Sequence, residues 1–198
     1  MGHSQVEKAK SRERILDAAA RRIREGGFDG LSIAELMKSA NLTHGGFYGH
    51  FPSRAALLAE ALERAMDRGE ASPVAAPAKA PGSVKSIVNS YLSPEHRDNF
   101  ASGCAVAALA CDVARSDDDE VRALMASRLE LSFEHMAGAM GDSAAARDAA
   151  VTAWCTMVGA LALSRVCRGR PRSEEILRQA RQSILDLEAR VRESEAGP

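Results

Sequence analysis

The segment from Leu31 to Leu57 constrains this chain more than any other, because its spacing predicts two short helices joined by a tight turn. Ser32 precedes an apolar run and Glu35 follows three residues later, which is the capping-box pattern of a helix start. Asn41 is suited to the left-handed conformation that ends a helix, and Thr43 is the predicted N-cap of the second helix. Helix-turn-helix proteins place the early residues of such a second helix on base edges in the DNA major groove.

Two adjacent glycines, Gly45 and Gly46, stand early in this predicted second helix. In a helix interior each glycine costs about 1 kcal/mol relative to alanine. Their presence indicates that side-chain bulk is unwelcome there, as it would be beside a phosphate or a base edge. The alternative is that the two glycines simply form a turn.

The sequence around this segment resembles the TetR family of bacterial transcriptional regulators over residues 10–60. The matching runs are Arg14–Ala19, Gly26–Phe28, Leu31–Ala34, Leu42–Phe51, Ser53-Arg54 and Leu57-Leu58. The most specific part is the Tyr-x-His-Phe-x-Ser-basic pattern of residues 48–54, which a generic helix-turn-helix does not require.

The resemblance implies roles for individual residues in DNA binding. Five of them match family positions that hold phosphates: Ser32, Thr43, Tyr48, His50 and Arg54. His44 and Gly45 fall where the family reads bases. Gly49 departs from the pattern, because it lacks a side chain that often contacts DNA, so we expect fewer direct contacts here.

The distribution of charge supports a nucleic-acid-binding N-terminal segment, although the whole chain has a net charge of −1. Residues 1–54 hold nine of the 26 lysines and arginines and six of the 27 acidic residues, a net of +3. The remainder then holds 17 basic and 21 acidic residues, a net of −4. This asymmetry concentrates positive potential where phosphates would bind. The alternative for any one of these cations is an ordinary solvated helix face.

Composition predicts an all-α fold, since helix formers dominate and aromatic residues make up only 4% of the 198 residues. We expect a three-helix DNA-binding head at 1–54, a connecting helix at 55–70, and a ligand-binding and dimerisation bundle at 82–198, about nine helices in all. The segment 71–81 holds three prolines and is the predicted linker. Within the bundle, 95–102 is predicted to be a polar loop, and Ser173 is predicted to cap the last helix.

Several other classes of protein lack support in the sequence. There is no uncharged apolar stretch of 18 residues and no apolar signal-peptide core, so we expect no transmembrane span, no membrane partner and a cytoplasmic location. In that compartment the four cysteines are expected to be reduced, and their spacing does not match a zinc site. We therefore expect no metal and no cofactor. The five histidines are scattered, and no hydrolase, P-loop or zinc-protease motif appears, which argues against an enzyme.

Two segments of the predicted bundle suggest contact with a second copy of the chain. The centre of the helix at 144–166 is apolar on more than one face, and the last helix carries apolar residues at steps of three and four. The predicted dimer-interface residues are Val158, Leu161, Leu177, Ile184, Leu187 and Val191. A dimer would also suit DNA, because two-fold pairs of helix-turn-helix units read palindromes. The alternative is an intramolecular core.

A regulator requires a signal that changes its DNA binding, here called its input, and the sequence suggests two candidate inputs. The first is an apolar small-molecule pocket, because methionine and aromatic side chains suit adaptable cavities. Its predicted lining is Phe100, Met125, Phe133, Met136, Met140, Trp154 and Met157, although any one such residue is more often plain core. The second is Cys104, which follows Gly103 at a predicted helix start, where the helix dipole favours a reactive thiolate.

Together with the family resemblance, these features predict a ligand-responsive transcriptional regulator, most simply a repressor. It would bind a palindromic operator in double-stranded DNA as a homodimer and be released by a small-molecule effector. The alternative input is a thiol-based response to electrophiles or oxidants through Cys104, acting on the same DNA-binding head. A scaffold that binds other proteins through its helical seam would leave the Tyr48-to-Phe51 run unexplained.

Overall fold

The computed structural model describes residues 2–69, 82–141 and 143–196. Within these ranges the chain forms nine α-helices and one 3₁₀ helix, with no strand, which confirms the predicted all-α class. The predicted linker at 71–81 lies outside the described residues.

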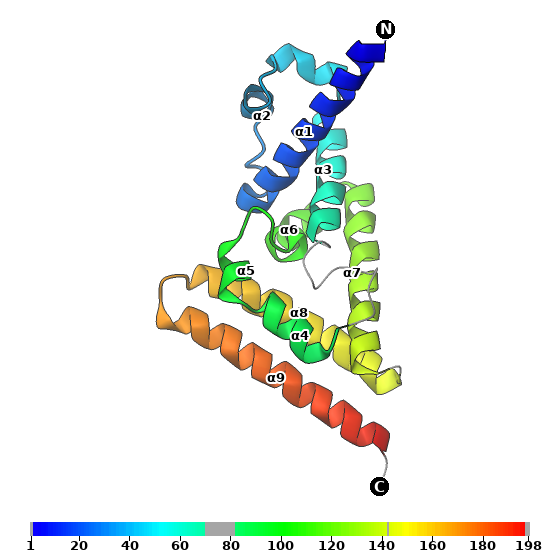
Figure 1. Ribbon diagram of the computed structural model, residues 1–198, viewed down its shortest axis with the longest axis vertical. Helices are drawn as coiled ribbons and strands as arrows, with labels where there is room; N and C mark the ends of the chain where they lie inside the picture. Colours follow the sequence, from blue (N-terminus) through cyan, green and yellow to red (C-terminus); the bar gives the residue numbers. More distant parts are fainter. Residues whose placement is uncertain (1, 70–81, 142, 197–198) are drawn as a thin grey trace.

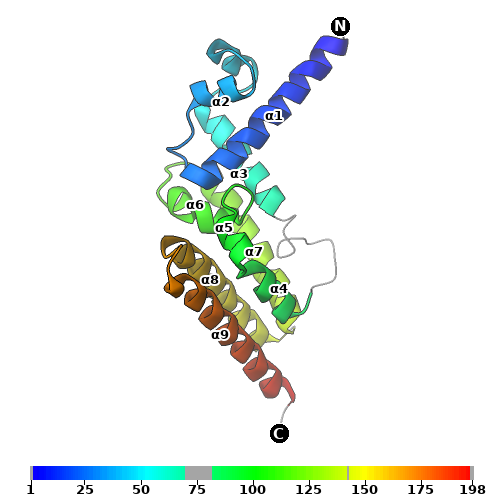
Figure 2. The same ribbon diagram turned by 60° about the vertical axis from the view of Figure 1, so that its left-hand side comes forward.

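The helices build an elongated molecule with the N-terminal helices at one end and the last two helices at the other (Figures 1 and 2). α3, α6 and the upper part of α7 lie between these two ends. The elements are α1 (Gly2–Gly26), α2 (Ile33–Ser39), η1 (His44–Gly49), α3 (Arg54–Gly69), α4 (Val84–Tyr91), α5 (Pro94–Asp98), α6 (Ala105–Ala114), α7 (Asp119–Met140), α8 (Ala144–Val166) and α9 (Pro171–Ala196).

Two predictions about local structure were wrong. The expected polar loop at 95–102 begins with a helical turn, α5, which is capped by Ser93 and has Pro94 at its first position. The last helix begins at Pro171 rather than after Ser173. Ser173 is 1% exposed, and its hydroxyl donates to the carbonyl of Ser164 at 2.7 Å, so the residue ties α9 to α8.

Local chemistry explains where the N-terminal helices end. Gly27 follows α1 with φ +71°, and Asn41 follows α2 with φ +58°, so both occupy the left-handed region that terminates helices. Ser53 caps α3 by accepting a hydrogen bond from the amide of Ala56 at 3.0 Å. These three residues set the angles between the first helices.

A first hydrophobic core joins the N-terminal helices to the beginning of the bundle. Its buried residues include Ile15, Ile23, Leu36, Phe47, Phe51, Leu57, Leu62, Leu109, Val113 and Met125. Because the last three belong to α6 and α7, the N-terminal helices (the head) and the helices that follow α3 (the body) share one core. A second core lies between α4, the end of α7, α8 and α9.

Arg24 adds a polar connection between the head and the body. Its side chain is 5% exposed at the end of α1. Its Nε donates to the carbonyl of Ala101 at 2.7 Å, and its Nη1 donates to the carbonyl of Ala65 at 2.9 Å. The guanidinium therefore holds the α5–α6 loop against α1 and α3.

Candidate nucleic-acid interface and regulatory core

The helix-turn-helix predicted from the sequence is present, with α2 as its first helix. Ser32 is the N-cap, and its Oγ accepts a hydrogen bond from the amide of Glu35 at 3.4 Å. Leu42 closes the turn with a bond from its amide to the carbonyl of Met37 at 2.9 Å. The second helix, η1, is a 3₁₀ helix. Thr43 is the N-cap of this helix, as predicted, and has extended conformation, but its side chain makes no capping hydrogen bond.

Aromatic side chains anchor η1 on the head and leave one ring outside. Phe47 and Phe51 are each 1% exposed, and their rings stack with centroids 5.8 Å apart. Tyr48 is 69% exposed, with its ring edge-on to Phe47 at 5.2 Å. Packing inside the head therefore holds η1 in place while leaving the Tyr48 ring and hydroxyl available to a partner.

The glycines of η1 are not required by packing within the chain. A Cβ built on Gly45 or Gly49 would meet nothing within 4 Å, and one on Gly46 would make only ordinary contacts with Thr43 and Met37. None of the three has a positive φ. The bare backbone of this segment thus offers room for an external group to approach closely, as at a DNA backbone or base edge.

Lys8 and Arg12 of α1 lie near the end of η1, and neither was among the predicted site residues. Burial lowers the pKa of His50, and the positive charges of Lys8 and Arg12 lower it further. The Arg12 guanidinium lies 4.8 Å from the centre of the Phe51 ring and pairs with Glu60 at 2.5 Å. The basic stretch at the start of α1 was visible in the sequence, but only the fold brings it next to His50.

Arg54 at the start of α3 is exposed, and its Nη2 donates to the carbonyl of Phe28 at 2.6 Å. This bond fixes the guanidinium beside the helix-turn-helix. His44 is also exposed, at the first position of η1. The DNA contacts of these two residues stay predictions.

The seven residues predicted to line a ligand pocket fall into three places. Phe133, Met136, Met140, Trp154 and Met157 pack in the second core. Met125 belongs to the first core. Phe100 lies near the head, where the guanidinium of Arg165 stacks over its ring at 4.6 Å. Five of the seven are therefore brought together.

The second core contains two buried polar atoms without hydrogen-bond partners among the described residues. They are the hydroxyl of Tyr91 and Nε1 of Trp154, on side chains whose rings are 5.4 Å apart. Tyr91 is 1% and Trp154 is 5% exposed. Burial raises the pKa of Tyr91 well above its ordinary value, and the neighbouring thiol of Cys104, a weak hydrogen-bonding group, acts in the same direction. Tyr91 was absent from the predicted pocket, because nothing in the sequence showed that α4 packs against α8.

Cys104 stands at the start of α6, as predicted. It is the N-cap, with its Sγ accepting from the amide of Ala107 at 3.5 Å, and it is partly buried. The loop before it is tightly packed, since a Cβ on Gly103 would lie 2.4 Å from the carbonyl oxygen of Asn99 and 2.8 Å from Nη2 of Arg165. Burial lowers the pKa of Arg165, while Cys104 and Tyr91 act to raise it. The thiol, the phenol and the guanidinium thus lie close enough to influence one another.

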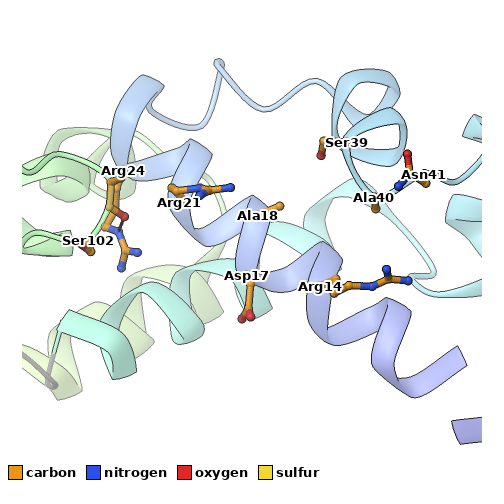
Figure 3. Close-up of a pocket in the computed structure, with 10 residues that line it drawn as sticks. Arg14, Asp17, Ala18, Arg21, Arg24, Ser39, Ala40, Asn41 and Ser102 are labelled. Atoms are coloured by element: carbon orange, nitrogen blue, oxygen red, sulfur yellow. Dashed lines mark hydrogen bonds between the residues drawn. The ribbon is translucent and has the colours of Figure 1, made fainter. Parts of the chain in front are cut away.

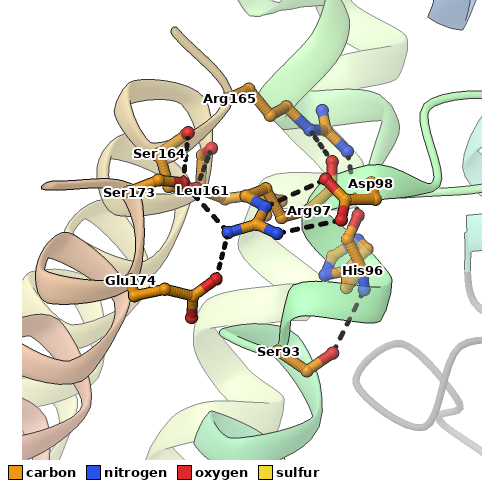
Figure 4. A network of polar contacts seen from close by, with 9 residues as sticks. All are labelled: Ser93, His96, Arg97, Asp98, Leu161, Ser164, Arg165, Ser173 and Glu174. Atoms are coloured by element: carbon orange, nitrogen blue, oxygen red, sulfur yellow. Dashed lines mark hydrogen bonds and ion pairs between the residues drawn. The ribbon is translucent and has the colours of Figure 1, made fainter. Parts of the chain in front are cut away.

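A polar network around α5 fastens this loop to the last two helices (Figure 4). Arg97 is 8% exposed and binds the carboxylate of Asp98 through two bonds of 2.9 Å. Its Nη1 also donates to Ser173 at 3.0 Å and to Glu174 at 2.5 Å. Because of these carboxylates, the pKa of Arg97 is raised above its already high ordinary value.

Four of the six residues predicted for a dimer interface are buried inside one chain. Leu161, Leu177, Ile184 and Val191 are between 0% and 6% exposed, and Val158 and Leu187 pack against the same core. The intramolecular alternative accounts for the four buried residues, whereas Val158 and Leu187 are only partly buried and their place in a dimer interface stays a prediction. A side chain that is already covered has little area left for a second copy.

A different face of α8 is apolar and uncovered. Val151 is 44%, Leu163 is 59% and Val166 is 83% exposed, Cys155 is exposed, and Gly159 has open space at its Cβ position. The steps between these residues are three and four, so they share one helical face. By length and composition α8 could also cross a membrane, but this is weak evidence, since core helices pass the same test.

Potential metal ligands and the cysteines are spread over the described parts of the chain. Across residues 2–69, 82–141 and 143–196, no three histidine, cysteine or acidic side chains are grouped as metal ligands would be. The four cysteines are all free thiols.

Comparison with known proteins matches the head to a family and the whole chain to a fold. The model of the bacterial regulatory proteins of the tetR family matches residues 15–61. An uncharacterized HTH-type transcriptional regulator of Mycobacterium tuberculosis is 27% identical over 185 residues, which cover 88% of this chain and 94% of that protein.

Two solved structures illustrate the shared fold. A TetR-family transcriptional regulator from Streptomyces coelicolor has a TM-score of 0.73 at 19% identity, over 92% of this chain and 96% of that chain. The reduced form of E. coli NemR has a TM-score of 0.71 at 21% identity, over 88% of this chain and 95% of that chain. The family match coincides with the helices that carry the candidate interface.

Proposed function

Since the chain belongs to the TetR family of bacterial transcriptional regulators, we propose that it is a repressor that binds a palindromic operator as a homodimer and is released by a small-molecule effector. We place it in the cytoplasm and assign it no catalytic activity. The observation that supports the proposal best is the surface of η1, where an exposed Tyr48 and a bare glycine backbone lie beside cations.

Binding to DNA is tested with duplex from the region upstream of the coding sequence, against random duplex, over a series of salt concentrations. We expect selective binding by two chains per site and a steep loss of affinity with salt, because neutralised phosphates release counterions. If neither this region nor a genome-wide selection yields a selective site, the proposal fails.

Two substitutions separate phosphate contact from base reading. Tyr48→Ala removes a proposed phosphate contact and should weaken binding to all sequences alike. His44→Ala removes a proposed base contact and should lower the ratio of operator affinity to random-DNA affinity. An equal loss for both kinds of DNA in the His44 variant would refute its reading role.

For the homodimer we propose the exposed face of α8 rather than the buried seam of α9. The uncovered stripe that includes Leu163 and Val166 leaves apolar area in contact with water. A partner that covered this stripe would remove that area from water. Two α8 helices can approach closely where Gly159 has no side chain. Leu163→Glu should yield a monomer by light scattering and weaken operator binding, whereas Leu131→Glu, which alters an exposed residue of α7, should leave the dimer intact.

For the effector site we propose the second core around Tyr91 and Trp154. A buried hydroxyl and a buried indole N–H without partners are costly, so a ligand carrying hydrogen-bond acceptors would gain by pairing with them. The surrounding methionines can repack around different ligands. The two heads of a dimer can stand at a spacing that fits the operator or at one that does not. An effector acts by binding more tightly to the conformation with one spacing than to the conformation with the other.

The effector site is tested by thermal-shift screening of small-molecule libraries. Compounds that raise Tm should also release operator DNA, and both effects should weaken in Trp154→Phe, which keeps the ring but loses the N–H. If no class of compound shifts Tm, or if Trp154→Phe responds like the wild type, this site is wrong.

The second candidate input is oxidation or alkylation of Cys104. The specific observation in its favour is the placement of the Cys104 thiol at a helix start beside Tyr91 and Arg165. After mild peroxide or quinone treatment, mass spectrometry should show modification of Cys104, and DNA binding should fall in the wild type but not in Cys104→Ser. Cys111→Ser is the matched control, since Cys111 is an exposed thiol on the same helix.

A further inference from the structure

A basic groove of about 550 Å³ lies where the head meets the body (Figure 3). One wall is α1, with Arg14, Arg21 and Arg24, and the opposite wall is the end of α2. Ala101 and Ser102, from the loop before Cys104, close the groove from the body side. The groove is therefore bounded by both functional parts of the molecule.

The charge lining this groove is positive. It holds three arginines and one carboxylate, that of Asp17. Asp17 is paired with Arg64 of α3 at 2.6 Å, and its side chain points away from those of Arg14 and Arg21 (Figure 3). The negative charge is thus compensated from outside the groove, while Arg14 and Arg21 have no carboxylate partner among the described residues.

Several hydrogen-bond donors in the groove lack a protein acceptor. Arg21 is exposed and has no hydrogen bond or ion pair in the described parts of the chain, and the same holds for the side-chain amide of Asn41. Arg14 makes one contact, to the hydroxyl of Ser11 at 3.0 Å, and has no carboxylate partner. Arg14 and Arg21 extend toward the α2 side, where Asn41 lies (Figure 3).

We propose that this groove binds a small polyanion, a molecule with two or more carboxylate or phosphate groups. The planar guanidinium fork suits bidentate contact with both kinds of oxyanion. The guanidinium groups of Arg14 and Arg21 lie along the same wall, α1, and the amide of Asn41 lies on the opposite wall. This arrangement would hold a ligand with two separated anionic groups better than a ligand with a single charge. This site is distinct from the proposed effector core around Trp154.

Binding here would affect the angle between head and body. The ligand would contact α1 and α2 of the head together with the 101–102 loop, which Arg24 already holds against α1. A bound polyanion would therefore favour the arrangement seen here over others. A change in the angle of the head would alter DNA affinity, and this consequence rests on the proposed function, whereas the binding of the polyanion does not.

The site is tested by calorimetric titration of the full-length protein with inorganic pyrophosphate and with citrate, at low and matched ionic strength. We expect saturable binding of one ligand per chain, with acetate as a monovalent comparison that binds more weakly. Arg21→Gln should raise the Kd about tenfold or more, because a charge-assisted hydrogen-bond donor is lost. Arg178→Gln, which removes an exposed arginine of α9, should leave the Kd unchanged.

Three outcomes would overturn the proposal. The first is the absence of saturable binding at millimolar pyrophosphate or citrate. The second is an equal response of Arg21→Gln and Arg178→Gln, which would indicate nonspecific attraction. The third is that Arg21→Gln lowers DNA affinity and its salt dependence without changing pyrophosphate binding, because the arginine would then serve the DNA backbone. Unchanged thermal melting of the variants shows that each outcome concerns the site and not folding.

Discussion

The backbone amide of Cys104 donates a hydrogen bond to Nε2 of His96 at 2.9 Å, so this nitrogen is an acceptor and the imidazole is neutral. Nδ1 then carries the proton and donates to the carbonyl of Tyr91 at 2.6 Å. The ring of His96 also packs edge-on against Tyr91, with centroids 4.7 Å apart. One neutral histidine thus connects α4, α5 and the start of α6, which are the elements around both candidate inputs.

This relationship predicts a loss of stability in acid. Burial lowers the pKa of His96, and Arg165 lowers it further, so below the ordinary value of 6.5 the unfolded chain takes up a proton more readily than the folded chain. The stabilisation is fully present above that value and decreases as pH falls through it toward the lowered pKa. Urea unfolding at a series of pH values from about 8 to about 5 measures how steeply the free energy of unfolding depends on pH.

The control for this prediction is His96→Gln, which cannot titrate. Its stability should depend less on pH, with a remaining slope of the same sign from His50, whose pKa is also lowered. Equal slopes in the wild type and the variant would show that His96 does not carry the effect.

Removing the hydroxyl of Tyr91 should not destabilise the protein. The oxygen is buried with no nitrogen or oxygen partner among the described residues, and the thiol of Cys104 beside it is only a weak hydrogen-bonding group. Tyr91→Phe therefore removes a desolvated polar group and should raise the free energy of unfolding by up to about 1 kcal/mol. The same variant should respond less to effectors found by thermal shift. Chemical denaturation measures the first effect, and a clear loss of stability would mean that the hydroxyl is paired.

Gly45→Ala should separate folding from DNA binding. The added methyl group meets nothing within 4 Å in the chain, and alanine reduces the entropy of the unfolded state, so stability should stay constant or rise by up to about 1 kcal/mol. Operator affinity should fall, because the methyl group would occupy space needed by the DNA. Fluorescence anisotropy measures the operator affinity. If the variant binds with wild-type affinity, Gly45 serves only as a turn residue.

Arg97 should matter more for stability than an exposed arginine. Arg97→Met removes the contacts to Asp98, Ser173 and Glu174 and should lower the free energy of unfolding by about 2 kcal/mol. Arg172→Met is the matched control: its pair with Glu175 is solvent-exposed, so it should cost less than about 1 kcal/mol. Similar losses in the two variants would show that the α5 network adds no more than a surface pair.

Local patterns in the sequence were sufficient for the fold class and for the helix-turn-helix. Caps and helix ends depend on residues within one turn of each other, so Ser32 and Asn41 could be interpreted without the fold. The exposed position of Tyr48 and the burial of Phe47 follow from helical periodicity in the same way. The family resemblance then supplied the roles that are proposed for these residues.

The regulatory part depended on contacts between distant segments, which no local pattern encodes. The apolar steps of α9 predicted a seam correctly, but only packing showed that Leu177 and Ile184 face α8 of the same chain. Tyr91 contacts Trp154 because α4 packs on α8, and Arg21 and Asn41 line one groove because α1 lies beside the end of α2. The sequence by itself determined which helices form and where they end, since those depend on short-range hydrogen bonding. The tertiary structure alone decided which apolar faces are covered and which polar groups lack partners, because both depend on how the helices pack.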